Sequence, residues 1–186
     1  KAKNYASAAA LYDLDATRAH ASELARQGYL TAEQLSTLTS ALDSLREDFL
    51  EGRLTPSPDD EDVHGALERE LISRVGADTG GAVRAGRSRN DQIATFVRMY
   101  LRDQTHSIRH MLIEVIRILI LRSEEAGTRF MPGRTHFQHA QPVLVAHHLL
   151  AHAWPLLRNI QRLDDWAVRN DASPYGSGAL AGGGLG

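Results

Sequence analysis

The longest part of the chain without glycine or proline runs from about residue 90 to residue 125. Its apolar side chains recur every three or four residues, the spacing of one helix face: Ile93, Val97, Tyr100, Leu101, Ile108, Leu112, Val115 and Leu119. A helix of about 35 residues is about 50 Å long, which exceeds the needs of a small domain. Residues 115–121 are also compatible with a strand, but no turn residues bound them. The pattern therefore predicts one long helix of a large bundle.

Local signals predict further helices on both sides of this stretch. A first helix is expected from about residue 12 to residue 27, because Gly28 suits the left-handed conformation that follows a helix end. Thr31 and Gln34 have the spacing of a capping box and predict the start of a second helix.

A third helix should follow the acidic residues 59–62, which favour the positive end of a helix dipole, and should end near residue 75. Pro142 is a good first residue for the last helix, which is expected to carry residues 143 to about 170. Glycine and proline predict irregular structure in two segments: residues 76–88 and residues 127–142.

Composition narrows the possible partners. The 186 residues carry a formal net charge of -2, without the basic surplus of a nucleic-acid-binding protein. Cysteine is absent, which fits a reducing compartment, so we expect the cytoplasm. No apolar stretch approaches the roughly 20 residues that span a bilayer, and residues 1–10 show no targeting signal. A small-molecule or protein partner is expected, and neither a nucleic acid nor a membrane.

The sequence Gly-Arg-Ser-Arg-Asn-Asp-Gln leads directly into the longest predicted helix. Arginine binds carboxylates through two parallel hydrogen bonds, and helix amino termini favour negative charge. Arg87 and Arg89 therefore indicate a site for an anion with several carboxylates. The alternative is that both arginines pair with acidic residues such as Asp91, while Ser88 or Asn90 only caps the helix.

Histidines mark two further polar segments. His136, beside Thr135, could act as an acid, a base or an oriented donor, although a loop histidine is more often structural. His64, beside Asp62, could donate to a substrate or simply support a helix start.

Three more histidines lie close together near the start of the last predicted helix: His147, His148 and His152. No cysteine, aspartate or glutamate lies within one helical turn of them, so they lack the ligands of a zinc site. We predict no metal site there and interpret the histidines as packing residues.

Five segments together resemble argininosuccinate lyases. They are Glu-Asp-Val-His at residues 61–64, Ala-Gly-Arg-Ser-Arg-Asn-Asp-Gln at 85–92, Met-Pro-Gly-Arg-Thr-His at 131–136, and the stretches 138–143 and 173–182. The resemblance covers nearly the whole chain from about residue 12. It implies the all-α fold of the fumarase/aspartase superfamily: a small helical amino-terminal domain, residues 1–88, followed by the first long helices of a central bundle, residues 89–186.

The resemblance also implies an activity, the reversible β-elimination of argininosuccinate to arginine and fumarate in arginine biosynthesis. It implies a homotetramer whose active sites combine segments of three subunits, with no metal or organic cofactor. By the same resemblance, Arg89 and Asn90 contact carboxylate or amino-acid groups of the substrate and Ser88 shapes their loop. Asp62 and His64 match an acidic-histidine pair that organises the site.

Thr135 and His136 would face the succinyl part of the substrate, with His136 as the proton-transfer or orienting group. The family's mobile Gly-Ser-Ser loop, which carries the serine usually assigned as the base, has no counterpart in these residues. We therefore expect the isolated chain to be inactive. Two alternatives are a superfamily lyase for adenylosuccinate, fumarate or aspartate, which should lack the Gly-Arg-Ser-Arg-Asn-Asp-Gln string, and a non-enzymatic crystallin-like scaffold.

Overall fold

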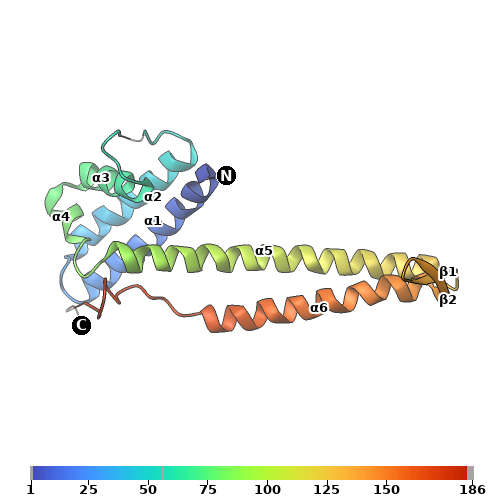
Figure 1. Cartoon of the computed structure of the whole chain (residues 1–186). Coiled ribbons are helices and arrows are strands. Elements are labelled where there is room, and N and C mark those ends of the chain that lie inside the picture. The colour runs from blue at the N-terminus through green and yellow to red at the C-terminus, as the bar shows by residue number, and fades with distance from the viewer. Residues whose placement is uncertain (1, 56, 184–186) are drawn as a thin grey trace. The chain divides into compact units, whose positions relative to one another are not determined.

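The computed structural model describes residues 2–55 and 57–183, and over these ranges it has six helices and one two-stranded antiparallel sheet (Figure 1). In chain order the elements are α1 (Ala2–Arg26), α2 (Ala32–Leu50), α3 (Val63–Val75), α4 (Ala77–Ala82), α5 (Arg89–Ala126), β1 (Phe130–Thr135), β2 (Gln138–Leu144) and α6 (Val145–Asn170). The expected helical class is confirmed, with a small hairpin added. Within the described ranges, none of the helices is both long enough and apolar enough to cross a membrane.

The chain divides into two compact units. The first contains Lys1–Tyr100 together with Ser173–Gly186, and the second contains Leu101–Ala172. Helix α5 contributes its first residues to one unit and the remainder to the other. The domain boundary predicted between residues 88 and 89 stays a prediction.

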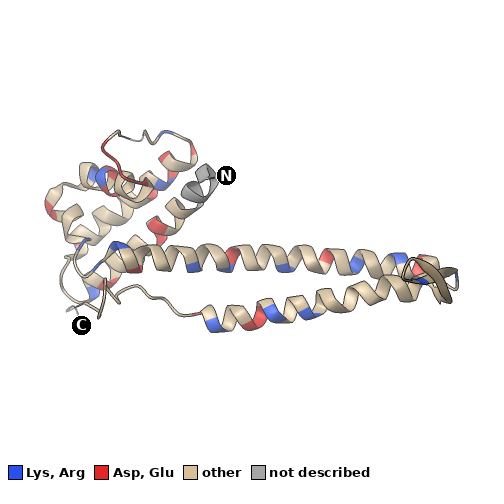
Figure 2. Ribbon diagram, viewed as in Figure 1, with Lys and Arg blue, Asp and Glu red and all other residues tan. Residues whose placement is uncertain are grey.

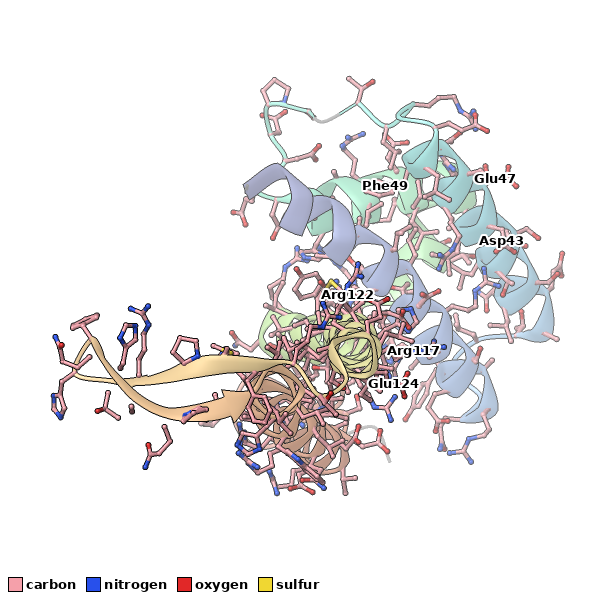
Figure 3. The ribbon with its side chains drawn as sticks, turned by 90° about the vertical axis from the view of Figure 1, so that its right-hand side faces the viewer. Asp43, Glu47, Phe49, Arg117, Arg122 and Glu124 are labelled. Carbon is pink, nitrogen blue, oxygen red and sulfur yellow. The ribbon has the colours of Figure 1, made fainter. Side chains whose placement is uncertain are left out.

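The first unit has a core formed by α1 to α4. Leu38, Leu42 and Leu45 on α2 are all but fully buried, at the spacing of one helix face. Burying each such side chain contributes about 1.5–3 kcal/mol. Phe49 also lies on the side of α2 that packs against this core, whereas Asp43 is exposed (Figure 3).

The predicted signals for the ends of α1 and α2 are confirmed. Gly28 has a φ of 82°, and the amide of Tyr29 donates to the carbonyl of Leu24 at 2.8 Å, which closes α1 as a left-handed glycine turn. Thr31 and Gln34 form the complete capping box of α2. However, α1 begins at residue 2 rather than at residue 12, because the alanine-rich stretch before residue 12 has high helix propensity.

Residues 76–88 were predicted to be irregular, but they include the short helix α4. In this segment glycine is needed for close packing between helices as well as for turns. A Cβ atom on Gly80 would lie 2.9 Å from the Cα atom of Ile72, so only glycine lets α4 pack this closely against α3.

The prediction of an irregular segment at residues 127–142 was also wrong, because β1 and β2 form a hairpin in the second unit. Thr135 pairs with Gln138, and the two residues between them, His136 and Phe137, have φ values of 49° and 62°. Two positive φ values define a tight hairpin turn that normally carries Asn-Gly. Pro142 lies in β2, and α6 begins at residue 145 instead of residue 143.

The second unit leaves much apolar surface exposed. Large side chains on α5 and α6 are more than half exposed, including Met111 at 58%, Ile118 at 55% and Trp154 at 64%. Basic and acidic residues are interspersed along α5 (Figure 2). The ion pair between Arg109 and Asp164, 2.9 Å apart, joins α5 to α6.

Candidate functional site

The seven predicted site residues are divided between the two units. The first unit holds five of them: Asp62, His64, Ser88, Arg89 and Asn90. Thr135 and His136 belong to the hairpin of the second unit, where both side chains are exposed. Their roles stay predictions.

Ser88 immediately precedes α5 and caps it. Its Oγ accepts a hydrogen bond from the amide of Asn90 at 3.3 Å, and its carbonyl accepts from the amide of Gln92 at 3.2 Å. This is the capping role that the sequence left open for Ser88. The helix therefore begins with its positive end at the segment that carries Arg89 and Asn90.

The two arginines of this segment have different surroundings. The side chain of Arg87 is only 9% exposed, donates to Thr17 at 3.3 Å and lies 3.7 Å from a carboxylate oxygen of Glu68. The side chain of Arg89 is 41% exposed, donates to Gln92 at 3.2 Å and lies 3.8 Å from a carboxylate oxygen of Asp62. Arg87 is thus a scaffold residue, and Arg89 is the arginine that a ligand could reach.

Asp62 and His64, which the resemblance matches to an acidic-histidine pair, bond different partners. Asp62 caps α3, since its Oδ1 accepts from the amide of Gly65 at 2.7 Å. His64 is buried and its Nδ1 lies 2.8 Å from Oδ2 of Asp13 on α1. A carboxylate only accepts, so Nδ1 of His64 donates. The acidic partner of His64 is therefore Asp13.

Asp13 is the centre of a buried polar network that sequence reasoning missed. It is 4% exposed and accepts from Thr17 Oγ1 at 3.0 Å, His64 Nδ1 at 2.8 Å and Gln92 Nε2 at 3.0 Å. These bonds join α1, α3 and the first turn of α5. One indication of this role was present in the sequence. Asp13 lies on the same helix face as Ala9 and Ala10, which are buried, so a buried carboxylate could be expected there.

His20 supports the loop before α5 from α1. Its Nε2 lies 2.9 Å from the carbonyl oxygen of Ala85. Burial lowers the pKa of His20, so the ring is neutral at pH 7 and donates to this carbonyl. Arg87, from the same loop, donates to Thr17, which also lies on α1. Two side chains of α1, His20 and Thr17, therefore hold this loop.

Arg89 also borders a groove of about 470 Å³ on the first unit. Its lining carries both signs of charge: Asp59, Asp60, Glu61, Gly65, Glu68, Arg69, Ile72, Arg84 and Arg89. Two of these acids are already paired, Asp60 with Arg69 at 2.9 Å and Glu68 with Arg84. Hydrogen bonding from Arg69 lowers the pKa of Asp60. The groove can therefore offer both cationic and anionic groups to a polar ligand.

The described residues contain no group of three or more side chains placed to hold a metal ion. On α6, the rings of His148 and His152 pack edge to face with their centroids 5.0 Å apart.

The chain belongs to the Lyase family, which matches residues 3–186. It is similar to the argininosuccinate lyases of Leifsonia xyli subsp. xyli, 58% identical over 179 residues, and Mycolicibacterium smegmatis, 54% identical over 186 residues. These matches cover 96% and 100% of the chain but only 38% and 40% of the relatives. The resemblance to argininosuccinate lyases read from the motifs is confirmed.

Solved structures support the same fold. An EDDS lyase variant with bound fumarate has a TM-score of 0.84 and is 30% identical, over 97% of this chain and 35% of that chain. The class II fumarase from Schistosoma mansoni has a TM-score of 0.74 over 95% of this chain and 39% of its own. At 17% identity it shows the fold alone.

Proposed function

We propose that this chain is part of an argininosuccinate lyase that cleaves argininosuccinate reversibly to arginine and fumarate. Identity of 54–58% to argininosuccinate lyases over at least 94% of the chain carries the proposal. The exposed Arg89 at the amino end of α5 supports it chemically, because the substrate has carboxylates at both ends.

The reaction needs three things from the protein. A base must remove a proton from the carbon next to a carboxylate, the added negative charge must be held, and the guanidino nitrogen must leave with the electron pair and gain a proton. We assign the binding of substrate carboxylate or amino-acid groups to Arg89 and Asn90, in a turn shaped by Ser88. Asp62 and His64, the latter held by Asp13, organise this turn.

We assign the succinyl part of the substrate to Thr135 and His136, with His136 transferring or orienting a proton. The proposed protein is a cytoplasmic homotetramer with active sites built from three subunits, and the reaction uses no metal or organic cofactor. The exposed apolar side chains of the second unit, such as Trp154, support assembly, because large exposed apolar patches mark interaction surfaces.

The direct test is His136→Asn in the full-length protein, with fumarate formation followed by ultraviolet absorbance. We expect kcat to fall about 100-fold or more, the usual loss when a general acid or base is removed. The control is His106→Asn, which changes an exposed histidine of α5. Near-normal turnover of the His136 variant would remove its assigned role. An inactive but folded wild-type protein would favour the crystallin-like scaffold.

A second test uses the 186-residue chain itself. It contains no Gly-Ser-Ser sequence and spans 35–40% of the argininosuccinate lyases compared with it. We propose that it releases no fumarate from argininosuccinate. Sustained turnover by the purified chain would show that the serine loop of the family is dispensable.

A further inference from the structure

Asp91 is a buried carboxylate to which neither the motif nor the proposed reaction gives a role. It lies in the first turn of α5 and is 2% exposed. Its Oδ1 accepts from the amide of Ser88 at 3.2 Å. Its Oδ2 accepts from the amides of Gly176 and Gly178, at 3.0 and 2.8 Å. Asp91 therefore joins the turn before α5 to a segment that follows α6 in sequence, and both belong to the first unit.

The segment that meets Asp91 is a tight turn of residues 176–178, which we call the glycine turn. Gly176 and Gly178 have φ values of 95° and 68°, a conformation that side chains disfavour. This backbone directs two amides at one carboxylate oxygen. The amide of Gly182 donates to the carbonyl of Ser177 at 2.6 Å, so the chain after the glycine turn folds back onto it. The glycines are thus required by the contact with Asp91.

Three backbone amides, those of Ser88, Gly176 and Gly178, donate to the carboxylate of Asp91. Hydrogen bonds from amides to a carboxylate are about twice as strong as neutral ones. The first turn of a helix also favours an acidic residue. The two neighbouring arginines are engaged elsewhere, Arg87 with Thr17 and Arg89 with Gln92. The hydrogen bonds of Asp91 are therefore made to backbone amides of two separate segments.

We propose that Asp91 is a positioning residue of the anion site. It fixes Ser88, and with it the first residues of α5, Arg89 and Asn90, by tying the amide of Ser88 to the glycine turn. This inference rests on the proposed lyase function, since it concerns the geometry of the same site. Without this hydrogen bond, the amide of Ser88 has no acceptor on Asp91, and the backbone that carries Arg89 is less ordered.

Two variants of the full-length protein test the inference. Asp91→Asn keeps the shape but leaves one oxygen for three amides, and Gly178→Ala disturbs the glycine turn without touching the carboxylate. A Cβ on residue 178 would lie 3.1 Å from the carbonyl oxygen of Gly182, at a φ unfavourable for alanine. The matched control is Asp78→Asn, which changes an exposed carboxylate on α4.

Hydrogen exchange and steady-state kinetics are both measured. In Asp91→Asn, the amides of residues 88, 176 and 178 should exchange about tenfold faster or more, as loss of a charged hydrogen bond predicts. For both variants KM for argininosuccinate should rise about tenfold while kcat changes less, because the defect is in binding geometry. Asp78→Asn should change neither quantity.

The possible outcomes separate the two proposals. Wild-type KM in Asp91→Asn, or a fall in kcat alone with KM unchanged, would overturn the positioning role and leave the lyase proposal intact. If the wild-type protein does not cleave argininosuccinate but the amides exchange faster in Asp91→Asn, the lyase proposal fails. The hydrogen bonds of Asp91 to the two segments would still be supported. Unchanged exchange at residues 88, 176 and 178 would overturn the tie itself.

Discussion

Replacing Asp13 by asparagine should destabilise the first unit more than any exposed change of the same kind. The carboxylate is 4% exposed and accepts three hydrogen bonds, from Thr17, His64 and Gln92. Asparagine has one acceptor oxygen and turns its NH₂ group toward a donor. At least one buried donor then lacks an acceptor, at about 1–3 kcal/mol each, and we expect a loss of about 2–4 kcal/mol.

The assay is urea unfolding followed by far-ultraviolet circular dichroism, with the free energy of unfolding extrapolated to water. The control is Asp43→Asn, which breaks the ion pair of Asp43 with Arg18. The Asp43 side chain is 58% exposed, so the cost should stay below about 1 kcal/mol. If Asp13→Asn costs no more than the control, then the buried network does not stabilise the unit and the reasoning fails.

Other consequences of the structure can be measured in the same way. Thr31→Ala removes the capping box of α2 and should cost about 1 kcal/mol of unfolding free energy in the same urea titration. Gly80→Ala should cost about 1–3 kcal/mol, because the added Cβ meets the backbone of Ile72 at 2.9 Å; an unchanged urea midpoint would refute this packing. Burial raises the pKa of Tyr175 to about 12, against the opposing charge of Arg87. The unfolded chain thus loses the tyrosine proton at a lower pH than the folded state does. The free energy of unfolding is therefore unaffected by Tyr175 below pH 10 and falls as the pH rises from 10 toward 12. Tyr175→Phe should flatten stability over that range, as unfolding at several pH values would show.

Features set by neighbouring residues could be predicted from the sequence. The capping box of α2 and the long helix α5 depend on spacing within a few residues, and both are confirmed. The hairpin could not be predicted in this way, because His136 and Phe137 occupy a turn whose usual sequence is Asn-Gly.

Within the site, sequence reasoning gave the segment but not the surroundings of each side chain. Arg87 and Arg89 are two positions apart and chemically identical, and only packing against Glu68 and Thr17 buries one of them. Asp13 lies 51 residues from His64 and 79 from Gln92, so no local pattern indicated that it binds both.

The hairpin tip has a cost that determines how it presents its imidazole. Left-handed backbone at a residue other than glycine costs about 1–3 kcal/mol, and His136 and Phe137 both adopt it. A longer glycine-bearing loop would avoid this energy but would let the ring sample many directions. Two residues between paired strands hold the backbone of His136, and with it the Cα–Cβ bond, in one direction. The imidazole therefore turns only about its own side-chain bonds, and the direction in which the backbone presents it depends on the β1–β2 ladder.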